Sequence, residues 1–379
     1  MTTQLALYER TLTLHRFPVI DNDPLQAWNA GDEYLINHMA SFTIDEDSHI
    51  LILNDNFGAL SCWFSPLCKV TTMSDSYVSH QAIKNNLSNN HCPEITLLST
   101  LDELPADVDV VLMQIPHNAR HLKWQLTALR QALPAHCQII AVDKAQDIRT
   151  ATLNTFTHYL GQTTTSLAWK KHRLVFSIPD SKNLASMPAP LVWSVPEHDL
   201  TISNLANVFS AESLDIGARF MLDHLPQDNN LESILDLGCG NGVLSVKLAK
   251  LNPQAEITSV DESYMAVASA HTNLCELNNL ADSKRFNLVT NNCLDGFDAN
   301  QFDLVVCNPP FHQQKTITDH IAWQMCQDAK RVLKVGGKLL LIGNRHLRYD
   351  IKLAKLFKKS HVTTVAANNK FVILQATKS

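Results

Sequence analysis

Short apolar runs alternate with helix-like periodic segments through the second half of this 379-residue chain. An apolar run bounded by turn residues predicts a buried strand, and apolar residues three and four apart predict one face of a helix. Strands and helices that alternate in this way predict an α/β fold with a parallel sheet. The predicted strands span residues 233–237, 256–260, 302–307 and 338–342, and the predicted helices span 243–251 and 265–278.

The first half of the chain repeats the order of elements of the second half. Four stretches match in the same sequence order, which indicates an internal duplication. The aligned pairs are 50–61 with 234–245, 74–76 with 260–262 (Asp75 over Asp261), 110–116 with 304–310, and 126–142 with 325–342. We therefore expect two tandem Rossmann-like domains, at 1–180 and 200–379, joined by a proline-rich linker at 181–199.

A glycine-rich turn distinguishes the second copy from the first. Gly238 and Gly240 lie between a predicted strand and a predicted helix, where glycine lets the backbone approach a ligand closely. The first copy has Asn54 and Asn56 at the same two positions. Side chains there would block that approach, so the first copy is expected to keep the fold and to be degenerate as a site.

An acidic residue follows the next predicted strand of the second copy. Asp261 stands 19 residues after Gly242, where a carboxylate can accept hydrogen bonds from ribose hydroxyls. The G-x-G-x-G spacing of the preceding turn differs from the G-x-G-x-x-G of dinucleotide-binding proteins, which disfavours NAD. The turn and the acid together predict a nucleoside-containing cofactor.

The motif Asn308-Pro309-Pro310-Phe311 ends a third predicted strand, because two prolines cannot continue a sheet ladder. The Asn308 amide oxygen and the Pro309 carbonyl can both accept hydrogen bonds from an amino group. Phe311 offers a face on which a planar ring can stack. Open α/β sheets bind ligands at the carboxyl ends of their strands. The motif therefore predicts a catalytic site for a planar amine, although an ordinary strand-to-loop turn is the alternative.

Basic residues cluster late in each copy, although the net charge of −6 disfavours a general attraction to polyanions. Residues 330–378 include twelve Lys or Arg and one acid, and residues 120–182 include nine basic and three acidic residues. A region that is basic in both copies predicts a shared nucleic-acid surface, whereas a solvated helix face would explain the lysines at 352–359 equally well. The candidates for RNA binding are Lys170, Lys171, Arg173, Arg345, Arg348 and Lys370.

The remaining composition excludes several classes of protein. Nine cysteines with no C-x-x-C pair and no His/Cys cluster at zinc spacing predict no structural metal and a reducing, cytoplasmic location. No apolar run approaches the ~18 residues of a membrane span. Residues 1–15 mix charged and apolar positions, which is not the pattern of a signal peptide. Cys239 and Cys307 lie near the predicted site and are expected to be packing residues.

The glycine turn, Asp261 and the Asn308 motif, in this order, resemble the S-adenosylmethionine-dependent methyltransferases of the Rossmann-like class over residues 200–379. The resemblance implies S-adenosylmethionine as the cofactor. It implies that Asp236 lies beside the amino-acid end of the cofactor, that Asp261 binds the ribose and that Asn292 lies near the adenine. The cofactor-binding turn would consist of Gly238, Gly240, Asn241 and Gly242.

Asn-Pro-Pro-aromatic motifs occur in enzymes that methylate adenine N6, guanine N2 or protein glutamine. The whole chain resembles the ribosomal RNA guanine-N2 methyltransferases, most closely those of the large subunit. The segments that support this resemblance are 25–28, 53–55, 167–171, 207–210, 214–219, 311–313 and 368–371.

This family resemblance implies methylation of a guanine amine in 23S rRNA, with the degenerate copy serving RNA recognition. It also implies that Phe209 and Ser210 lie near the cofactor. A guanine within a duplex cannot reach such a site, so the target is expected to be unpaired or flipped and stacked on Phe311. No obligate protein partner is evident. The alternatives are methylation of another planar nitrogen, on adenine or protein glutamine, and a non-catalytic RNA-binding or assembly factor.

Overall fold

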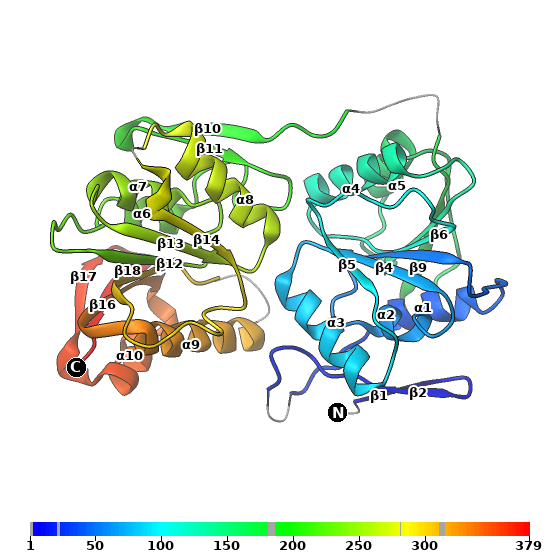
Figure 1. The fold of residues 1–379 in the computed structure, drawn as a ribbon, viewed down its shortest axis with the longest axis horizontal. Coiled ribbons are helices and arrows are strands. Elements are labelled where there is room, and N and C mark those ends of the chain that lie inside the picture. The colour runs from blue at the N-terminus through cyan, green and yellow to red at the C-terminus, as the bar shows by residue number, and fades with distance from the viewer. Residues whose placement is uncertain (1–2, 21–22, 181–185, 281, 311–314) are drawn as a thin grey trace. The chain divides into compact units, whose positions relative to one another are not determined.

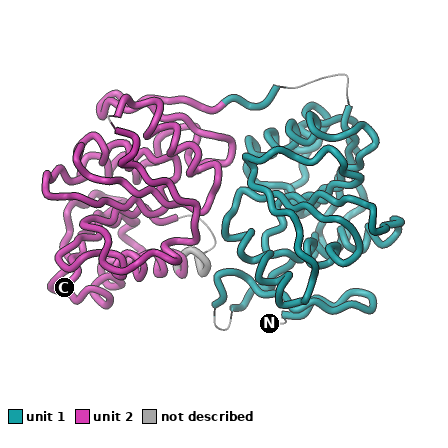
Figure 2. Tube along the Cα trace, in the orientation of Figure 1, with its two compact units in different colours: residues 1–189 teal, residues 190–379 magenta. Residues whose placement is uncertain are grey.

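The computed structural model describes residues 3–20, 23–180, 186–280, 282–310 and 315–379, with the backbone alone for 315–319. The chain divides into two compact units, residues 1–189 and 190–379 (Figure 2). Within the described ranges, the helices are too short or too polar to cross a membrane.

A seven-stranded sheet in the order β14-β13-β12-β15-β16-β18-β17 forms the centre of the second unit (Figure 1). Its strands are β12 (Ser233–Leu237), β13 (Glu256–Asp261), β14 (Phe286–Thr290), β15 (Phe302–Cys307), β16 (Leu333–Asn344), β17 (Val362–Ala367) and β18 (Phe371–Thr377). The first five strands in this order, from β14 to β16, are parallel to one another, and β18 is antiparallel to both of its neighbours. The α/β prediction is confirmed, but the sheet is mixed because the last two strands form a hairpin at one edge.

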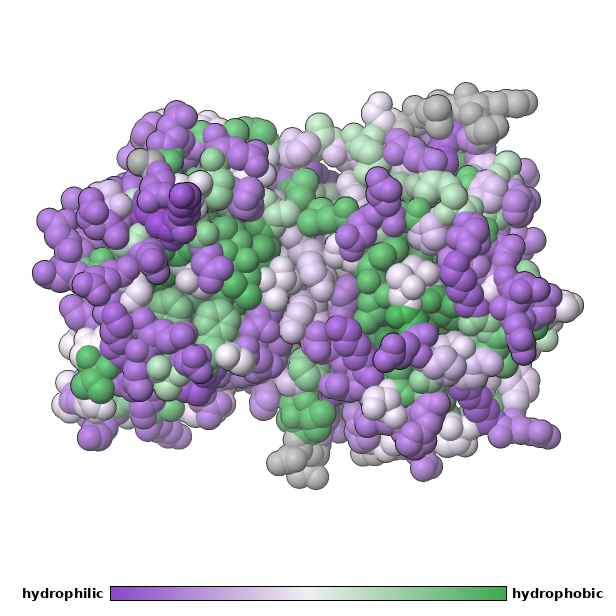
Figure 3. All heavy atoms as spheres, in the orientation of Figure 1, coloured by the Kyte–Doolittle hydropathy of each residue, from purple (hydrophilic) through white to green (hydrophobic). Residues whose placement is uncertain are grey.

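Helices cover both faces of this sheet. Successive residues of β12 point to opposite faces, so Ile234 packs with α6 and α7 while Leu235 packs with α9 and α10. Hydrophilic and hydrophobic side chains are interspersed on the visible surface of each unit (Figure 3). The helices are α6 (Ile216–Leu222), α7 (Val243–Leu251), α8 (Tyr264–Thr272), α9 (Lys315–Val332) and α10 (Tyr349–Phe357).

The first unit has the same strand connectivity, with the order β5-β4-β3-β6-β7-β9-β8. Its strands are β3 (His49–Leu53), β4 (Lys69–Ser74), β5 (Thr96–Ser99), β6 (Val110–Gln114), β7 (Gln138–Lys144), β8 (Thr163–Thr165) and β9 (His172–Ser177). Its helices are α1 (Ala30–Met39), α2 (Ala59–Phe64), α3 (Tyr77–Asn89), α4 (Ala119–Ala132) and α5 (Thr150–Tyr159). Identical orders confirm that the chain consists of two copies of one architecture.

Backbone pairing corrects one detail of the predicted alignment. Leu237 pairs with Val260 in the second unit, and Leu53 pairs with Met73 in the first. The residue after Met73 is Ser74, so Ser74 and not Asp75 corresponds to Asp261. Both stretches are polar where a strand ends, and sequence similarity alone could not fix a shift of one residue.

A β-hairpin precedes each sheet. β1 (Gln4–Leu7) pairs with β2 (Arg10–Thr13), and β10 (Leu191–Val195) pairs with β11 (Leu200–Asn204). The stretch 181–199, expected as a linker, therefore contributes β10 and the turn η1 (Pro196–His198) to the second unit. The prolines around this five-residue strand led to the prediction of a linker without regular structure.

A buried asparagine holds each hairpin to the rest of its unit. Asn273 Nδ2 donates to the carbonyls of Ser203 (2.9 Å) and Asn241 (2.8 Å), and its Oδ1 accepts from Ser203 N (2.8 Å). Asn86 makes the same three bonds in the first unit, two of them with His15. Corresponding networks in the two units extend the duplication to the hairpins.

Replacing Asn273 with alanine is expected to destabilise the second unit by roughly 2–4 kcal/mol, because three buried backbone groups lose their partners. Urea unfolding of the full chain measures the change. Asn287→Ala, at an exposed position of β14, is the matched control and should stay within about 0.5 kcal/mol of the wild type. Equal effects of the two substitutions would show that the network contributes no stability.

Candidate active site

The glycine-rich turn joins β12 to α7. Its glycines have φ values of 75°, 54° and 76° at Gly238, Gly240 and Gly242, all in the left-handed region. A Cβ at Gly240 would meet no atom of the described residues within 4 Å, whereas one at Gly242 would lie 2.8 Å from Ala270 Cβ. Gly240 therefore leaves room for a ligand against the backbone, and Gly242 lets α7 pack closely on α8.

Asp261 ends β13 beside this turn. Its Oδ2 accepts a hydrogen bond from Gly240 N (2.9 Å), and its Oδ1 accepts one from Ser263 N (3.0 Å). A carboxylate accepts hydrogen bonds at both of its oxygens, which is the character that a ribose diol requires. The carboxylate thus ties the turn to the start of α8, at the place where a ribose is expected.

Asp236 lies in β12, directly before the turn, and is only 1% exposed. Its Oδ2 accepts from Ser245 Oγ (2.6 Å), and its Oδ1 has no partner among the described residues. Burial is the main cause that raises the pKa of Asp236 to about 6, and the charge of Asp261 adds to it. A buried carboxylate oxygen without a donor fits the cationic methionine end of S-adenosylmethionine.

Affinity for S-adenosylmethionine is expected to fall as the pH drops below about 6, because protonation removes the negative charge of Asp236. The raised pKa also means that ionisation of Asp236 lowers the stability of the fold as the pH rises from about 4 to about 6. Calorimetric titrations between pH 5 and pH 8 measure the affinity. Asp236→Asn should bind more weakly and lose this pH step, and a wild-type affinity independent of pH would contradict the assignment.

Asn308 follows the end of β15, the strand that pairs with β12, so it lies at the same sheet edge as Asp236. Its Oδ1 is buried and has no partner among the described residues. Its Nδ2 donates to Asp215 Oδ2 over 3.5 Å. Pro309 is buried beside it, and Phe311 lies outside the described residues. A buried acceptor without a donor is thus placed near the glycine turn.

The other predicted cofactor residues lie in segments around the same edge. Asn241 Nδ2 donates to Asn204 Oδ1 (2.9 Å), which holds the turn to the end of β11. Asn292 is buried after β14, and its Nδ2 donates to Asp295 Oδ2 (2.8 Å). The segment after β11 also includes Phe209, which is 65% exposed, and Ser210, with a φ of 52°.

Two residues of this edge were not among the sequence predictions. Asp215 caps α6 by accepting from Ala218 N (2.9 Å) and contacts Asn308. Asn344, the last residue of β16, has a buried Oδ1 without a partner among the described residues. An acidic residue before an apolar helical run can be recognised in the sequence as a helix cap. The contact of Asp215 with Asn308, 93 positions away, has no local sequence signal.

Polar side chains fill the corresponding region of the first unit. Asn54 Nδ2 donates to Gln125 Oε1 (3.0 Å) and to the carbonyl of Gln114 (2.8 Å), and Gln114 Nε2 donates to Asp32 Oδ1 (2.6 Å). Asp55 accepts from the N–H groups that open α2. This internal network replaces the open glycine turn, as the expected loss of the site requires.

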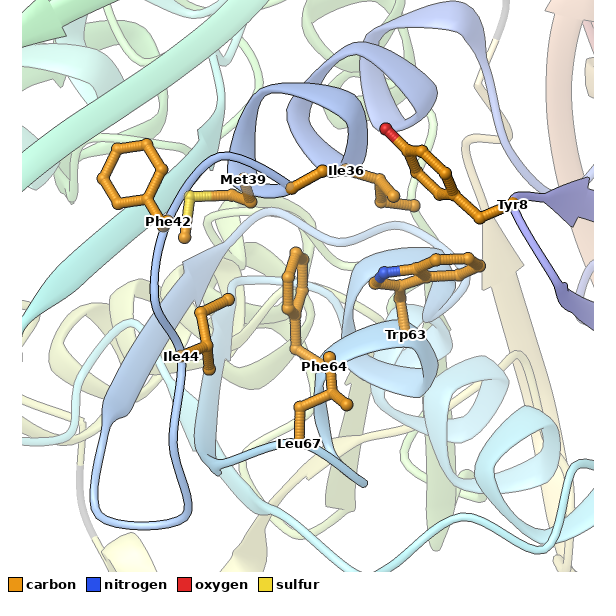
Figure 4. Close-up of a pocket in the computed structure, with 9 residues that line it drawn as sticks. Tyr8, Ile36, Met39, Phe42, Ile44, Trp63, Phe64 and Leu67 are labelled. Carbon is orange, nitrogen blue, oxygen red and sulfur yellow. The ribbon is translucent and has the colours of Figure 1, made fainter.

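A separate hollow of about 230 Å³ lies in the first unit, between α1 and α2 (Figure 4). Its walls are mainly apolar and aromatic. They include Ile36, Met39, Phe42, Ile44, Trp63 and Phe64. Apart from the hydroxyl of Tyr8, these side chains offer no acid, base or nucleophile, so the hollow is not assigned to the chemistry of the sheet edge.

The predicted RNA-binding residues lie at the carboxyl edges of the two sheets. Strand pairing places Lys171, before β9, in the position that Lys370 has before β18. Lys170 lies 4.5 Å from the centre of the Trp169 ring and pairs with Glu33. The others are Arg173 in β9, and Arg345 and Arg348, both exposed, in the segment after β16. Both units thus present lysine at the same hairpin tip.

The two cysteines predicted near this site are packing residues and add no chemistry to it. Burial raises the pKa of the Cys239 and Cys307 thiols well above the usual value, so both stay neutral at physiological pH. Among the residues that the structure describes, no group of three or more His, Cys, Asp or Glu is placed to hold a metal ion.

Two family models match the chain. Residues 2–181 match the RLMG N-terminal domain, and residues 199–375 match the methyltransferase small domain. Two relatives called ribosomal RNA large subunit methyltransferase G are similar over the full chain. The protein of Vibrio cholerae serotype O1 is 59% identical, with 100% of each chain covered, and that of Vibrio campbellii is 56% identical, with 100% of this chain and 98% of the relative covered.

A solved structure shares the fold of the whole chain. It is the T. thermophilus 16S rRNA N2 G1207 methyltransferase (RsmC) in complex with AdoMet and guanosine. The TM-score is 0.78 at 20% sequence identity, with 100% of this chain and 98% of the other covered. The fold of this chain is therefore also found in a solved structure.

Proposed function

Because this chain belongs to the family of the ribosomal RNA large subunit methyltransferases G, we propose that it transfers a methyl group from S-adenosylmethionine to N2 of a guanine in 23S rRNA. S-Adenosylmethionine supplies an electrophilic methyl group when bound. Gly240, Asp236 and Asp261 would hold it, for the geometric reasons given above. The Asn308 motif would hold the guanine.

The exocyclic amine of guanine is a poor nucleophile, because its lone pair is delocalised into the ring. Asn308 Oδ1 and the Pro309 carbonyl would accept hydrogen bonds from its two N–H groups and so direct the lone pair toward the methyl group. Most of the rate would come from this alignment. The proton can leave after the transfer, so no strong base is required. Phe311 would stack on the base.

The observation that supports this proposal most strongly is the buried Oδ1 of Asn308, which has no donor among the described residues and lies at the edge where the glycine turn lies. A buried acceptor without a partner is costly, and an amine donor would satisfy it. The names of the relatives point to ribosomal RNA of the large subunit as the source of that amine. The lysines at the two hairpin tips, Lys171 and Lys370, would contact the phosphate backbone.

Transfer of radiolabelled methyl from S-adenosylmethionine to undermethylated 23S rRNA tests the proposal. We expect labelled N2-methylguanosine after digestion of the RNA to nucleosides. Label on N6 of adenine, or on a glutamine of a ribosomal protein, would replace the guanine assignment with one of the other planar nitrogens. Charge reversal at Lys171 and Lys370 should raise the KM for RNA, whereas transfer to a protein would not need these residues.

A further inference from the structure

The carboxylate of Asp215 lies beside the amide of Asn308 at the carboxyl edge of the second sheet. Asn308 Nδ2 donates to Asp215 Oδ2 over 3.5 Å, and Asn308 Oδ1 has no donor among the described residues. We infer that Asp215 is a positioning residue, which fixes the orientation of the Asn308 amide so that its oxygen is presented to the substrate amine. This inference rests on the proposed function.

The two ends of an asparagine amide have nearly the same shape and opposite hydrogen-bonding character. If the Asn308 amide were flipped, its oxygen would face a carboxylate oxygen of Asp215, and two acceptors repel each other. The carboxylate therefore selects the orientation in which the NH2 group faces Asp215. Without that selection, the amide could present its NH2 group to an amine, and a donor cannot hold another donor.

Asp215 is itself held in place by the first turn of α6. The same Oδ2 accepts a hydrogen bond from Ala218 N (2.9 Å), which caps α6. A Cβ at Gly217 would lie 2.9 Å from Asp215 Oδ2 and 3.7 Å from Asn308 Oδ1. Glycine at 217 therefore leaves the space that the pair occupies. A side chain fixed in this way can determine the orientation of its neighbour.

The first unit has the same kind of pair without the proline motif. Strand pairing places Gln114 in the position of Asn308. Gln114 Nε2 donates over 2.6 Å to Asp32, which lies in the first turn of α1, the helix that corresponds to α6. A contact between a helix start and a strand end is thus part of the architecture. It supplies an internal control that reports on structure alone.

The competing explanation is that Asp215 only fastens α6 to β15. Asp215→Ser separates the two explanations, because serine caps a helix as well as aspartate but is too short to reach Asn308. We expect kcat to fall by about 10–100-fold through misalignment of the amine. The melting temperature and the affinity for S-adenosylmethionine should stay near the wild-type values. Asp215→Asn, which keeps the length but not the charge, should lie in between.

A double-mutant cycle makes this test quantitative. In single-turnover reactions, Asp215→Ser should cause no further loss in an Asn308→Ala background, because no amide is left to orient. The same fold-loss in both backgrounds would overturn the inference. Asp32→Ser, the matched change in the first unit, should lower the melting temperature and leave kcat at saturating RNA unchanged. If the fall in kcat of Asp215→Ser is fully explained by a smaller fraction of folded protein, Asp215 has only a structural role.

Side-chain amide NMR tests the pair without any substrate. The Asn308 NH2 resonances are identified by their loss in Asn308→Ala. We expect slow exchange of these protons with water in the wild type and faster exchange in Asp215→Ser. Unchanged exchange would overturn the inference even if the wild type methylates guanine. The wild type could instead transfer no methyl group to guanine N2 while the amide exchange still depends on Asp215. That result would refute the proposed function and leave the contact between Asp215 and Asn308 intact.

Discussion

Replacing Asn308 with alanine is expected to lower the rate of methyl transfer by roughly 10²–10³-fold, the range found when one preorganised polar contact to a reacting group is lost. The binding of S-adenosylmethionine should remain nearly unchanged, because Asn308 lies after β15 while the glycine turn lies after β12. Single-turnover transfer to undermethylated 23S rRNA measures the rate, and calorimetry measures the binding.

Gln114→Ala is the control for this experiment, because the two residues have equivalent positions. Gln114 comes directly after the last residue of β6 that pairs with β3, and Asn308 comes directly after the last residue of β15 that pairs with β12. Its removal takes a donor from the buried carboxylate of Asp32. The first unit should therefore lose stability, while kcat at saturating RNA stays the same. A rate loss as large as that of Asn308→Ala would mean that an amide at this place supports the fold in both units. Full activity of Asn308→Ala would exclude the proposed amine-holding role.

The parts of the site that the sequence could predict are determined by local chemistry. Gly238 and Gly240 mark a turn because glycine adopts their positive φ values at no steric cost. The two prolines after Asn308 end a strand, and β15 does end at Cys307. Because parallel strands bring their carboxyl ends to one edge, these local signals were sufficient to place the turn, Asp261 and Asn308 on a common edge.

The parts that the sequence could not predict depend on contacts between distant positions. Asp215 reaches Asn308 across 93 positions, and no spacing rule links a helix cap to a strand end. The hairpin that begins at Leu191 is held by Asn273, which lies far along the chain. Because that contact has no local signal, the prolines around Leu191 led to the prediction of a linker. The correspondence of Ser74 with Asp261 follows from the pairing of backbone strands. A comparison of two polar stretches of sequence does not reveal this pairing.

Asp261→Ala is expected to weaken the binding of S-adenosylmethionine by roughly 10–100-fold, as for the loss of a charge-assisted hydrogen bond of about 1.5–3 kcal/mol. In the proposed complex the carboxylate accepts from the ribose diol, and it also accepts from Gly240 N and Ser263 N. Calorimetric titration measures the affinity in the absence of RNA. An affinity within a factor of two of the wild type would place the ribose elsewhere.

The two tasks of Asp261 can be separated, since a loosened turn would also weaken binding. Asp261→Asn keeps one acceptor oxygen for the backbone but loses the charge. It should bind more tightly than Asp261→Ala and still more weakly than the wild type. Ser74→Ala, the matched change in the first unit, removes the acceptor of Ser76 N and should leave the affinity unchanged. If Ser74→Ala weakened binding as well, the first unit would also take up cofactor, which is difficult to reconcile with the side chains that fill its turn.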